Sequence, residues 1–178
     1  MPEPVKYFVA VLWADADALS VANARLVEGF GAIDFEGPDR AFDLTDYYET
    51  EMGANLMRRL VAFAPLRGPG DLPEAKLACN AIEAALPGPT GRQVNLDVGY
   101  LDHNKIVLAS AKAAGQKIYL RAGIYADLVA RYAQGRYLPF AWTFPDFKDA
   151  RYDAELGELR GHYLQQIKDW RKASRKMQ

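Results

Sequence analysis

The chain has 178 residues, half of them hydrophobic, and a formal net charge of -1 from 22 basic and 23 acidic side chains. This length is enough to bury the core of one domain. The near-neutral charge creates no global field toward nucleic acid or an anionic membrane, so we expect neither as a partner. The single cysteine, Cys79, excludes an internal disulfide framework. The first residues carry neither a basic leader nor a long apolar run, which predicts a cytoplasmic protein.

The chain opens with a strand followed by a helix. Residues 5–13, VKYFVAVLW, are β-branched and aromatic enough to predict a buried strand. Asp15 or Asp17 can then cap a helix, because an aspartate side chain accepts a hydrogen bond from a free N–H of the first turn. Apolar residues recur at three- and four-residue steps up to Gly31, where a left-handed residue would end the helix.

Two extended segments come next. Residues 33–44 alternate apolar and polar side chains around a GPDR turn, which predicts a strand that can double as a hairpin. The sequence TDYYETEMG then interrupts the pattern. Residues 55–64, NLMRRLVAFA, predict a further strand in which Arg58 and Arg59 point to opposite faces. Only one of these two arginines can therefore face a given site.

A helix over about residues 73–86, stopped by Pro-Gly-Pro, precedes the clearest strand, residues 93–101. Alternation along that strand places Asn95 and Asp97 on one face and four apolar side chains on the other. The order up to residue 101 is strand, helix, strand, strand, helix, strand. This order predicts an α+β fold with a ferredoxin-like βαββαβ core.

An extension, residues 102–178, completes what we expect to be a single domain over residues 1–178. Asp102 can cap a helix that reaches about Ala114, and KIYLR starts a second set of strands. The segment IYADLVARYAQGRYLPFAW predicts a hairpin that turns at Gln134-Gly135. A terminal helix then carries one apolar stripe, formed by Tyr152, Leu156, Leu159, Tyr163, Ile167 and Trp170.

The ferredoxin-like plan predicts where the two densest polar-aromatic segments lie. If its second and fourth strands run opposite to its first and third, the loop TDYYETEMG and the motif GYLDH share one edge of the sheet. We therefore expect these segments to be walls of one small-molecule pocket, with Lys6 at the same edge. The converging side chains are Asp43, Asp46, Tyr47, Tyr48, Glu49, Glu51, Asn95, Asp97, Tyr100, His103 and Lys105.

Paired carboxylates near a histidine or lysine can act as general acids and bases, because a shared or desolvated site separates their pKa values. We take Asp97, Asp46 and Glu49 as the candidate catalytic residues. Oxygen-rich clusters also bind magnesium, which leaves Mg²⁺ open as a cofactor. Some of these residues can instead have a structural role. Asp46 and Glu49 have the spacing of a capping box before a short helix that Gly53 would end. Asn95 and Asp97 can equally be a hydrogen-bonded strand face.

Aromatic and cationic side chains of the same segments are the candidates for ligand binding. Tyrosines can stack on a base or a sugar, although aromatic strand residues also serve packing. Arg58 or Arg59 can bind a carboxylate or phosphate in a bidentate way. The full set is Asn95, Tyr47, Tyr48, Tyr100, Arg58, Arg59, Lys105 and His103.

Familiar catalytic motifs do not occur in the chain. It has no GxxxxGK[ST], no GxGxxG opening a helix, no HExxH, no CxxC and no GxSxG. The third predicted strand reads LMRRLVAF rather than the glycine-aromatic pattern that stacks RNA bases. The slightly acidic charge agrees with this, so we do not expect an RNA-binding protein.

Four blocks resemble, in sequence and order, the motifs of an uncharacterised bacterial family, domain of unknown function 4416. They are FDLTDYYETEMG, NLDVGYL, IYLRAGIYADL and WTFPDF. The family has proline after the aspartate of its fourth-strand motif, where this chain has Val98. The resemblance implies a bacterial, single-domain, cytosolic protein with no established activity. Besides the pocket candidates, Trp142 and Asp146 fall within its blocks.

Two functions remain open. The first is an enzyme or ligand-dependent protein that binds or acts on a small polar or phosphorylated molecule at the carboxylate- and tyrosine-rich pocket. The second is a non-catalytic interaction module that forms a homodimer through the terminal helix or an open sheet edge, with WTFPDF as a contact loop. In the second case the apolar stripe of the terminal helix should be exposed in the monomer.

Overall fold

A computed structural model describes residues 2–176. Along the chain the elements are β1 (Lys6–Trp13), α1 (Ala16–Phe30), β2 (Ile33–Glu36), β3 (Arg40–Ala41), α2 (Glu49–Met52), β4 (Met57–Phe63), the 3-10 turn η1 (Pro69–Asp71), α3 (Leu72–Ala84), β5 (Val94–Leu101), β6 (Lys105–Ser110), β7 (Ile118–Arg121), β8 (Ile124–Ala133), β9 (Arg136–Pro139), α4 (Pro145–Lys148) and α5 (Asp153–Lys176).

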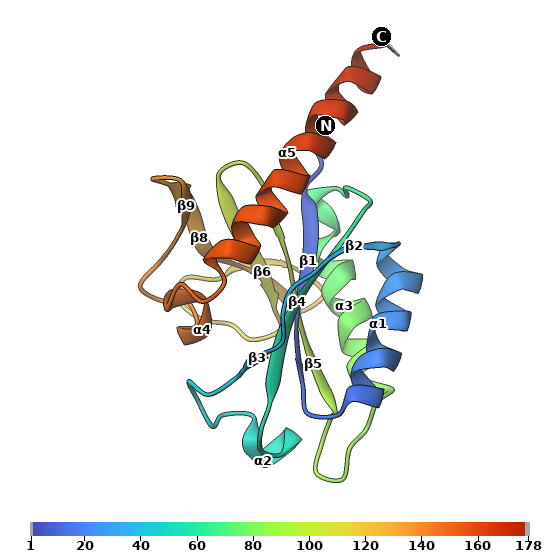
Figure 1. Ribbon diagram of the computed structural model, residues 1–178, viewed down its shortest axis with the longest axis vertical. Helices are drawn as coiled ribbons and strands as arrows, with labels where there is room; N and C mark the ends of the chain where they lie inside the picture. Colours follow the sequence, from blue (N-terminus) through green and yellow to red (C-terminus); the bar gives the residue numbers. More distant parts are fainter. Residues whose placement is uncertain (1, 177–178) are drawn as a thin grey trace.

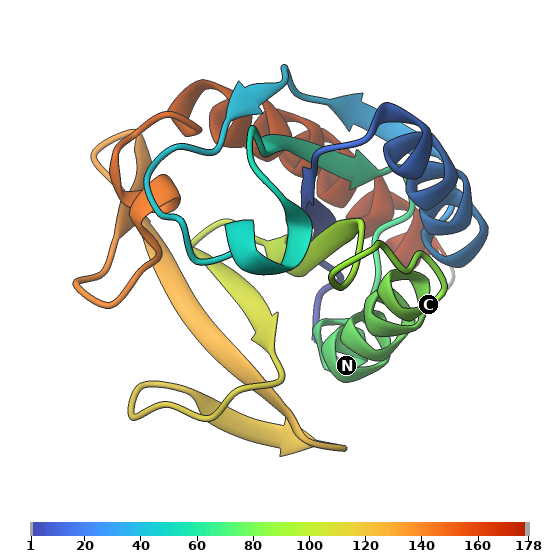
Figure 2. The ribbon, with the colours of Figure 1, turned by 90° about the horizontal axis from the view of Figure 1, so that it is seen from below.

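Within the described residues the strands form one nine-stranded antiparallel sheet, in the order β2-β4-β1-β5-β6-β8-β7, with β3 paired to β4 and β9 to β8. Helices α1 and α3 lie on one face of the sheet and α5 crosses the other (Figure 1). Seen from below, β7 forms the far edge, away from α1 (Figure 2). The fold is therefore a mixed α+β arrangement on a large antiparallel sheet. In residues 2–176 no helix combines the length and apolar character needed to span a bilayer.

The first helix begins and ends where the sequence predicts. The Asp15 carboxylate accepts a hydrogen bond from the Ala18 N–H at 2.8 Å, and Gly31 follows the last turn with φ 94°. The extended segment after it is one interrupted strand rather than a hairpin, because β2 and β3 both pair with β4. Across the interruption, the Gly37 N–H donates to the Leu60 carbonyl at 2.8 Å.

The helix predicted from Asp102 onward is wrong, because the chain forms β6 there. The Asp102 carboxylate stabilises a turn instead, accepting hydrogen bonds from the N–H groups of Asn104 (2.7 Å) and Lys105 (3.0 Å). The following run, residues 106–109, is buried throughout. A short continuous apolar run fits a strand covered on both faces as well as it fits a buried helix, so its own pattern did not distinguish them.

The predicted hairpin at Gln134-Gly135 is confirmed between β8 and β9. The two turn residues have φ values of 54° and 82°. A two-residue type I′ turn requires left-handed values at both positions, and glycine adopts them without a Cβ penalty.

The apolar stripe of the C-terminal helix is covered within the monomer. Tyr152 and the α5 residues Leu156, Leu159, Tyr163 and Ile167 are each at most 4% exposed and pack against one face of the sheet. Trp170 alone of the predicted stripe stays 40% exposed. The helix therefore closes a second core, opposite the one beneath α1 and α3.

Strand direction decides which loops meet. β1 runs antiparallel to both β4 and β5, with Trp13 opposite Met57 in β4 and Val94 in β5. β4 and β5 are therefore parallel to each other and begin at the same edge of the sheet. The predicted meeting of TDYYETEMG with GYLDH is wrong, because it assumed that these two strands run in opposite directions. The loop lies beside the first half of β5, which carries Asn95 and Asp97.

Candidate functional site

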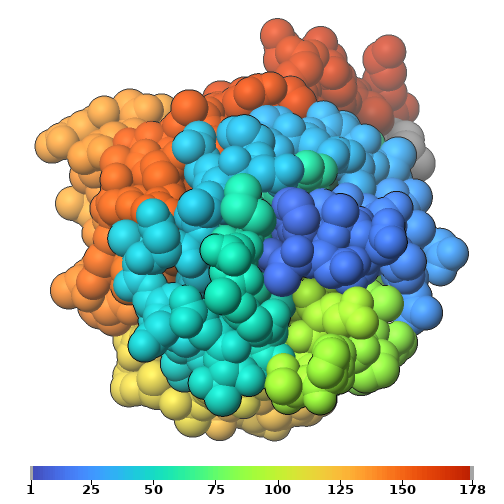
Figure 3. Space-filling view, turned by 60° about the horizontal axis from the view of Figure 1, so that its bottom comes forward, coloured from blue at the N-terminus to red at the C-terminus, as the bar shows by residue number. Residues whose placement is uncertain are grey.

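A cavity of about 350 Å³ opens at the sheet edge where β4 and β5 begin. Its walls come from the loop before α2, the first residues of β4 and β5, one side of α3, the end of β6 and the segment around α4. In Figure 3 the cyan-to-teal loop before β4 lies between the orange α4 segment and the light green loop before β5. The volume is within the range of small-molecule pockets.

The lining combines aromatic rings, cations and carboxylates. It includes the rings of Phe42, Tyr47, Tyr48, Phe144 and Phe147, the cations Arg58, Lys76, Arg92, Lys112 and Lys117, the carboxylates Asp97, Asp127 and Asp146, and the amides Asn80 and Asn95. Such a wall offers flat apolar surface together with donors and acceptors that can orient a polar ligand.

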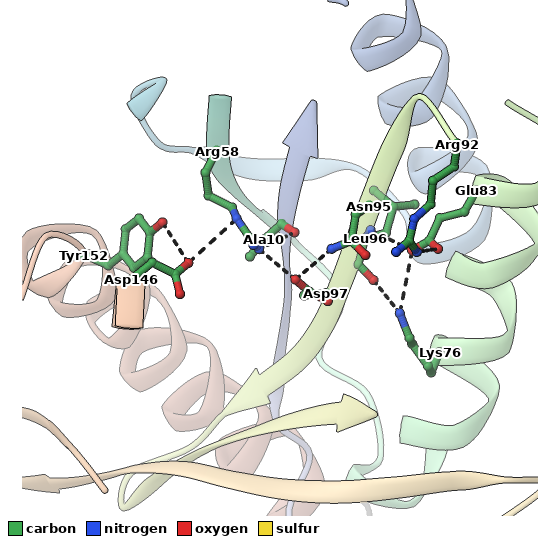
Figure 4. Close-up of polar contacts among 10 residues, drawn as sticks. All are labelled: Ala10, Arg58, Lys76, Glu83, Arg92, Asn95, Leu96, Asp97, Asp146 and Tyr152. Carbon is green, nitrogen blue, oxygen red and sulfur yellow. Dashed lines mark hydrogen bonds and ion pairs between the residues drawn. The ribbon is translucent and has the colours of Figure 1, made fainter. Parts of the chain in front are cut away.

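Arg58 occupies the centre of the first polar cluster. Its side chain is 4% exposed, and Nη1 donates to Asp97 Oδ2 at 2.8 Å and to the Ala10 carbonyl at 3.3 Å. Its Nε lies 3.8 Å from Asp146 Oδ2, so the guanidinium reaches toward carboxyls from β5 and α4 (Figure 4). The guanidinium carbon lies over the Phe42 ring, 4.8 Å from the ring centre. The strand alternation turns Arg59 away, where it binds Asp39 at 2.7 Å.

The pKa values of the two carboxyls beside Arg58 are shifted in opposite directions from their ordinary value. Burial raises the pKa of Asp97, but Arg58, Lys76 and the Asn95 amide that donates to it at 2.9 Å outweigh burial and leave it below its ordinary value. Burial raises the pKa of Asp146, Arg58 offsets only part of that rise, and Asp97 adds to it. Two carboxyl groups whose pKa values differ in this way can serve as a general base and a general acid.

A second buried network ties α3 to the start of β5. Lys76 Nζ donates to the Leu96 carbonyl at 2.9 Å and lies 3.7 Å from Glu83 Oε1, while Glu83 accepts from the Leu96 N–H at 2.7 Å (Figure 4). Glu83 also pairs with Arg92, whose Nε is 3.0 Å from Glu51 of α2. This chain of contacts holds the loop before β4 against β5.

A third cluster lies across the cavity, on β6, β8 and the loop before β7. Lys117 Nζ donates to Ser110 Oγ at 2.8 Å and lies 3.6 Å from Asp127 Oδ2. Asp127 is 3% exposed, and within residues 2–176 its Oδ1 finds no hydrogen-bond partner. Lys112 Nζ binds the hydroxyl of Tyr47, which is 61% exposed, so this contact spans the cavity mouth.

Five of the predicted site residues line the cavity: Tyr47, Tyr48, Arg58, Asn95 and Asp97. Asn95 and Asp97 both line the cavity because, as predicted, they lie on the same face of β5.

Four other candidates lie elsewhere, although we predicted that Lys105, His103, Tyr100 and one of the two arginines would join this edge. Lys105 pairs with Asp102 beyond the far end of β5, where the His103 Nδ1 lies 3.3 Å from the Tyr163 hydroxyl. Tyr100 packs in the core beneath α1 and α3, and Arg59 faces the opposite side of β4 from Arg58. Lys6 is also at the far end, where its Nζ donates to Asp34 at 2.7 Å.

Asp46 and Glu49 lie near the cavity but not in its lining. The capping-box prediction is wrong, because Tyr48 occupies the N-cap of α2 and makes no side-chain capping bond. Only the backbone joins the pair, through the Glu49 N–H and the Asp46 carbonyl at 2.9 Å. Gly53 ends this one-turn helix as expected, with φ 87°. In the part of the chain described, no three His, Cys, Asp or Glu side chains are grouped to hold a metal ion.

Sequence reasoning missed Lys76, Arg92, Lys112, Lys117 and Asp127. One signal was present: Lys76 and Glu83 are seven residues apart, on the same face of α3 as its buried apolar residues. Two opposite charges on an apolar stripe indicate a buried ion pair, because an isolated charge there would be costly. The others carry no local signal, since three different segments bring them together.

Searches of curated proteins and of solved structures found no match to the chain. A family model described as Domain of unknown function (DUF4416) matches residues 3–163. This range contains every segment that lines the cavity and all four of the motif blocks. The chain therefore belongs to the domain-of-unknown-function family DUF4416.

Proposed function

We propose that this protein binds, and acts on, a small polar phosphorylated molecule in the cavity at the start of β4 and β5. The observation that carries the proposal is the cavity itself, where five cationic side chains and several aromatic rings surround Asp97. Lysine and arginine bind phosphate oxygens, and the rings offer apolar surface for the remainder of a ligand.

Proton transfer is the chemistry that these residues support. Asp97, with its lowered pKa, is the candidate base, and Asp146, with its raised pKa, is the candidate acid. Asp146 takes the place of Asp46 and Glu49 in this proposal, because those two lie outside the cavity lining. Arg58 positions both carboxyls and does not itself exchange a proton.

A homodimer is the second candidate function, through the open sheet edge rather than the terminal helix. The stripe of α5 is buried against the sheet, but the edge strand β7 exposes 69% of Ile118 and 58% of Tyr119. An edge strand with exposed apolar side chains is a template for pairing with another chain. Light scattering that finds only monomers across a wide concentration range would remove this candidate.

We also infer that the core is ferredoxin-like. The partial order β2-β4-β1-β5, with α1 and α3 on one face, supports this assignment. The cytoplasmic location and the bacterial origin stay predictions from the sequence and its resemblance.

The binding proposal is tested by thermal unfolding in the presence of sugar phosphates, nucleotides and inorganic phosphate. A ligand that binds only the folded protein stabilises it by about 2.7 kcal/mol at 100 times its Kd. We expect a phosphate ester to raise the Tm of the wild type and of Asp43→Asn, an exposed carboxylate outside the lining. Asp97→Asn should lose most of this shift. No shift with any phosphorylated compound would contradict the proposal.

A further inference from the structure

The charges around the cavity are matched except at two places, the Arg58 cluster and Lys112. Lys76 and Arg92 have Glu83 and Glu51 as partners, and Lys117 has Asp127. Arg58, in contrast, is shared by two carboxyls: it lies 2.8 Å from Asp97 and 3.8 Å from Asp146. Among residues 2–176, Arg58 is the one cation that forms an ion pair with either carboxyl. The floor of the cavity therefore lacks one positive charge.

An unmatched negative charge in this position is costly, because Asp146 is 3% exposed and Arg58 is equally buried. Without a bound cation, this cluster can avoid the cost by holding one proton. Asp97 Oδ2 accepts two hydrogen bonds, from Arg58 and Asn95, and these stabilise its ionised form. Asp146 is too far from Arg58 Nε for a hydrogen bond, and its side-chain donor is the Tyr152 hydroxyl at 3.2 Å. Of the two carboxyls, Asp146 is therefore the one that takes up a proton more readily.

The groups facing this pair come from five segments, one of which is the loop before α2, where Asp97 adds to the rise in the pKa of Tyr48 that burial causes. Arg58 of β4, Asp97 of β5 and Tyr152, just before α5, face Asp146, whose pKa burial raises. Arg58, Asn95 and Lys76 of α3 face Asp97. Lys76 does not supply the missing charge, because Glu83 and the Leu96 carbonyl already engage its ammonium.

A second acceptor on the cavity wall also lacks a donor. Asp127, from β8, lines the cavity and is 3% exposed, and its Oδ1 has no hydrogen-bond partner within the described part of the chain. A buried carboxylate oxygen without a donor is rare in folded proteins unless a ligand or ion completes it. This observation is independent of the Arg58 cluster and indicates the same need for a hydrogen-bond donor.

The mouth of the cavity has the opposite character. Lys112 Nζ contacts the Tyr47 hydroxyl and lies 4.9 Å from its ring centre, and no carboxylate of residues 2–176 forms an ion pair with it. The cavity thus has an unmatched negative charge at its floor and an unmatched positive charge at its mouth.

We propose that the ligand is a phosphorylated primary amine, with its ammonium group between Asp97 and Asp146 and its phosphate at Lys112. This inference rests on the proposed function, since it assigns the chemical class of the ligand at the same site. The ammonium supplies the missing charge and donates hydrogen bonds to both carboxyls. A lone hydroxyl at that position would bring no charge.

The test compares ligands that differ only in this group. Glucosamine 6-phosphate is paired with glucose 6-phosphate, and phosphoethanolamine with 2-hydroxyethyl phosphate, by calorimetric titration near pH 7. We expect each amine to bind at least tenfold more tightly than its hydroxyl partner. Asp146→Asn, which removes one negative charge from the cluster, should reduce the preference for the amine.

Lys112→Met provides a second variant, on an exposed side chain that should not affect folding. It should weaken both members of each pair by a similar factor and leave their ratio unchanged. Equal binding of amine and hydroxyl partners to the wild type would overturn this inference and leave the proposed function standing. If no phosphorylated compound binds, the proposed function itself fails.

Discussion

Arg58 is the side chain on which the geometry of the candidate site depends. It lies almost fully buried between two carboxyls, while its neighbour Arg59 forms the same kind of contacts on the other side of β4, at the surface. Removing one partner of a buried ion pair leaves an uncompensated charge, which costs far more than breaking an exposed pair. The adjacent arginines therefore form a matched pair for measuring what burial contributes.

We expect Arg58→Met to lower the free energy of unfolding by about 3–5 kcal/mol, because Asp97 is left without its main cation. Arg59→Met should lower it by less than about 1 kcal/mol, since its partners Glu36 and Asp39 remain hydrated. Urea unfolding followed by circular dichroism measures both values. Equal losses in the two variants would show that the Arg58 cluster is not a buried ion pair in solution.

At the level of elements, β5 pairs with β6 at Gly99, Tyr100 and Leu101, just past Asn95 and Asp97. Gly99 continues the face of β5 that carries these two side chains. A Cβ on Gly99 would lie 2.4 Å from the Val107 carbonyl oxygen and 2.5 Å from Leu108 Cδ2. The backbone of β6 cannot yield without losing its pairing with β5, so this position accepts no larger side chain.

Gly99→Ala should therefore destabilise the protein by roughly 1–3 kcal/mol, the usual cost of overpacking a core. Gly115→Ala is the control, because a Cβ there meets no atom within 4 Å, and we expect a change within about 0.5 kcal/mol. Thermal or urea unfolding distinguishes the two. If Gly99→Ala were neutral, β6 would have to move away from β5 more easily than the close contact indicates.

At the scale of the whole molecule, one sheet joins the predicted core to its extension. β5 belongs to the first part and β6 to the second, and they pair directly. The core beneath α1 and α3 includes Val107 and Ile124 from the extension, and the core beneath α5 includes Phe8 and Leu60 from the first part. Neither part can bury its apolar surface alone.

We therefore expect a single cooperative unfolding transition. Tryptophan fluorescence, which samples Trp13, Trp142 and Trp170, and far-ultraviolet circular dichroism should give the same midpoint in urea. Leu159→Ala, in the core beneath α5, should shift both midpoints together and cost about 2–5 kcal/mol. Separate transitions for the two probes would mean that the first 101 residues and the extension unfold as independent units.

Much of the fold could be predicted from local pattern. Asp15 and Gly31 mark the two ends of α1, and Gln134-Gly135 forms the turn between β8 and β9. Alternation places Arg58 and Arg59 on opposite faces of β4, as predicted. The clearest wrong prediction was a helix in place of β6, because the continuous apolar run there fits a buried strand as well as a buried helix. The site was predicted in part, because its β5 half follows from alternation while its partners come from segments with no local signal.

The sequence by itself determined where most strands and helices begin and end, and which face of each strand is polar. These features depend on hydrogen bonds and side-chain periodicity within a few residues. Only the tertiary structure decided that β4 and β5 run parallel, that α3 contributes Lys76, and that α4 brings Asp146 to Arg58. Such meetings depend on the path of the whole chain, because residues distant in sequence are joined only when the sheet and its two cores form.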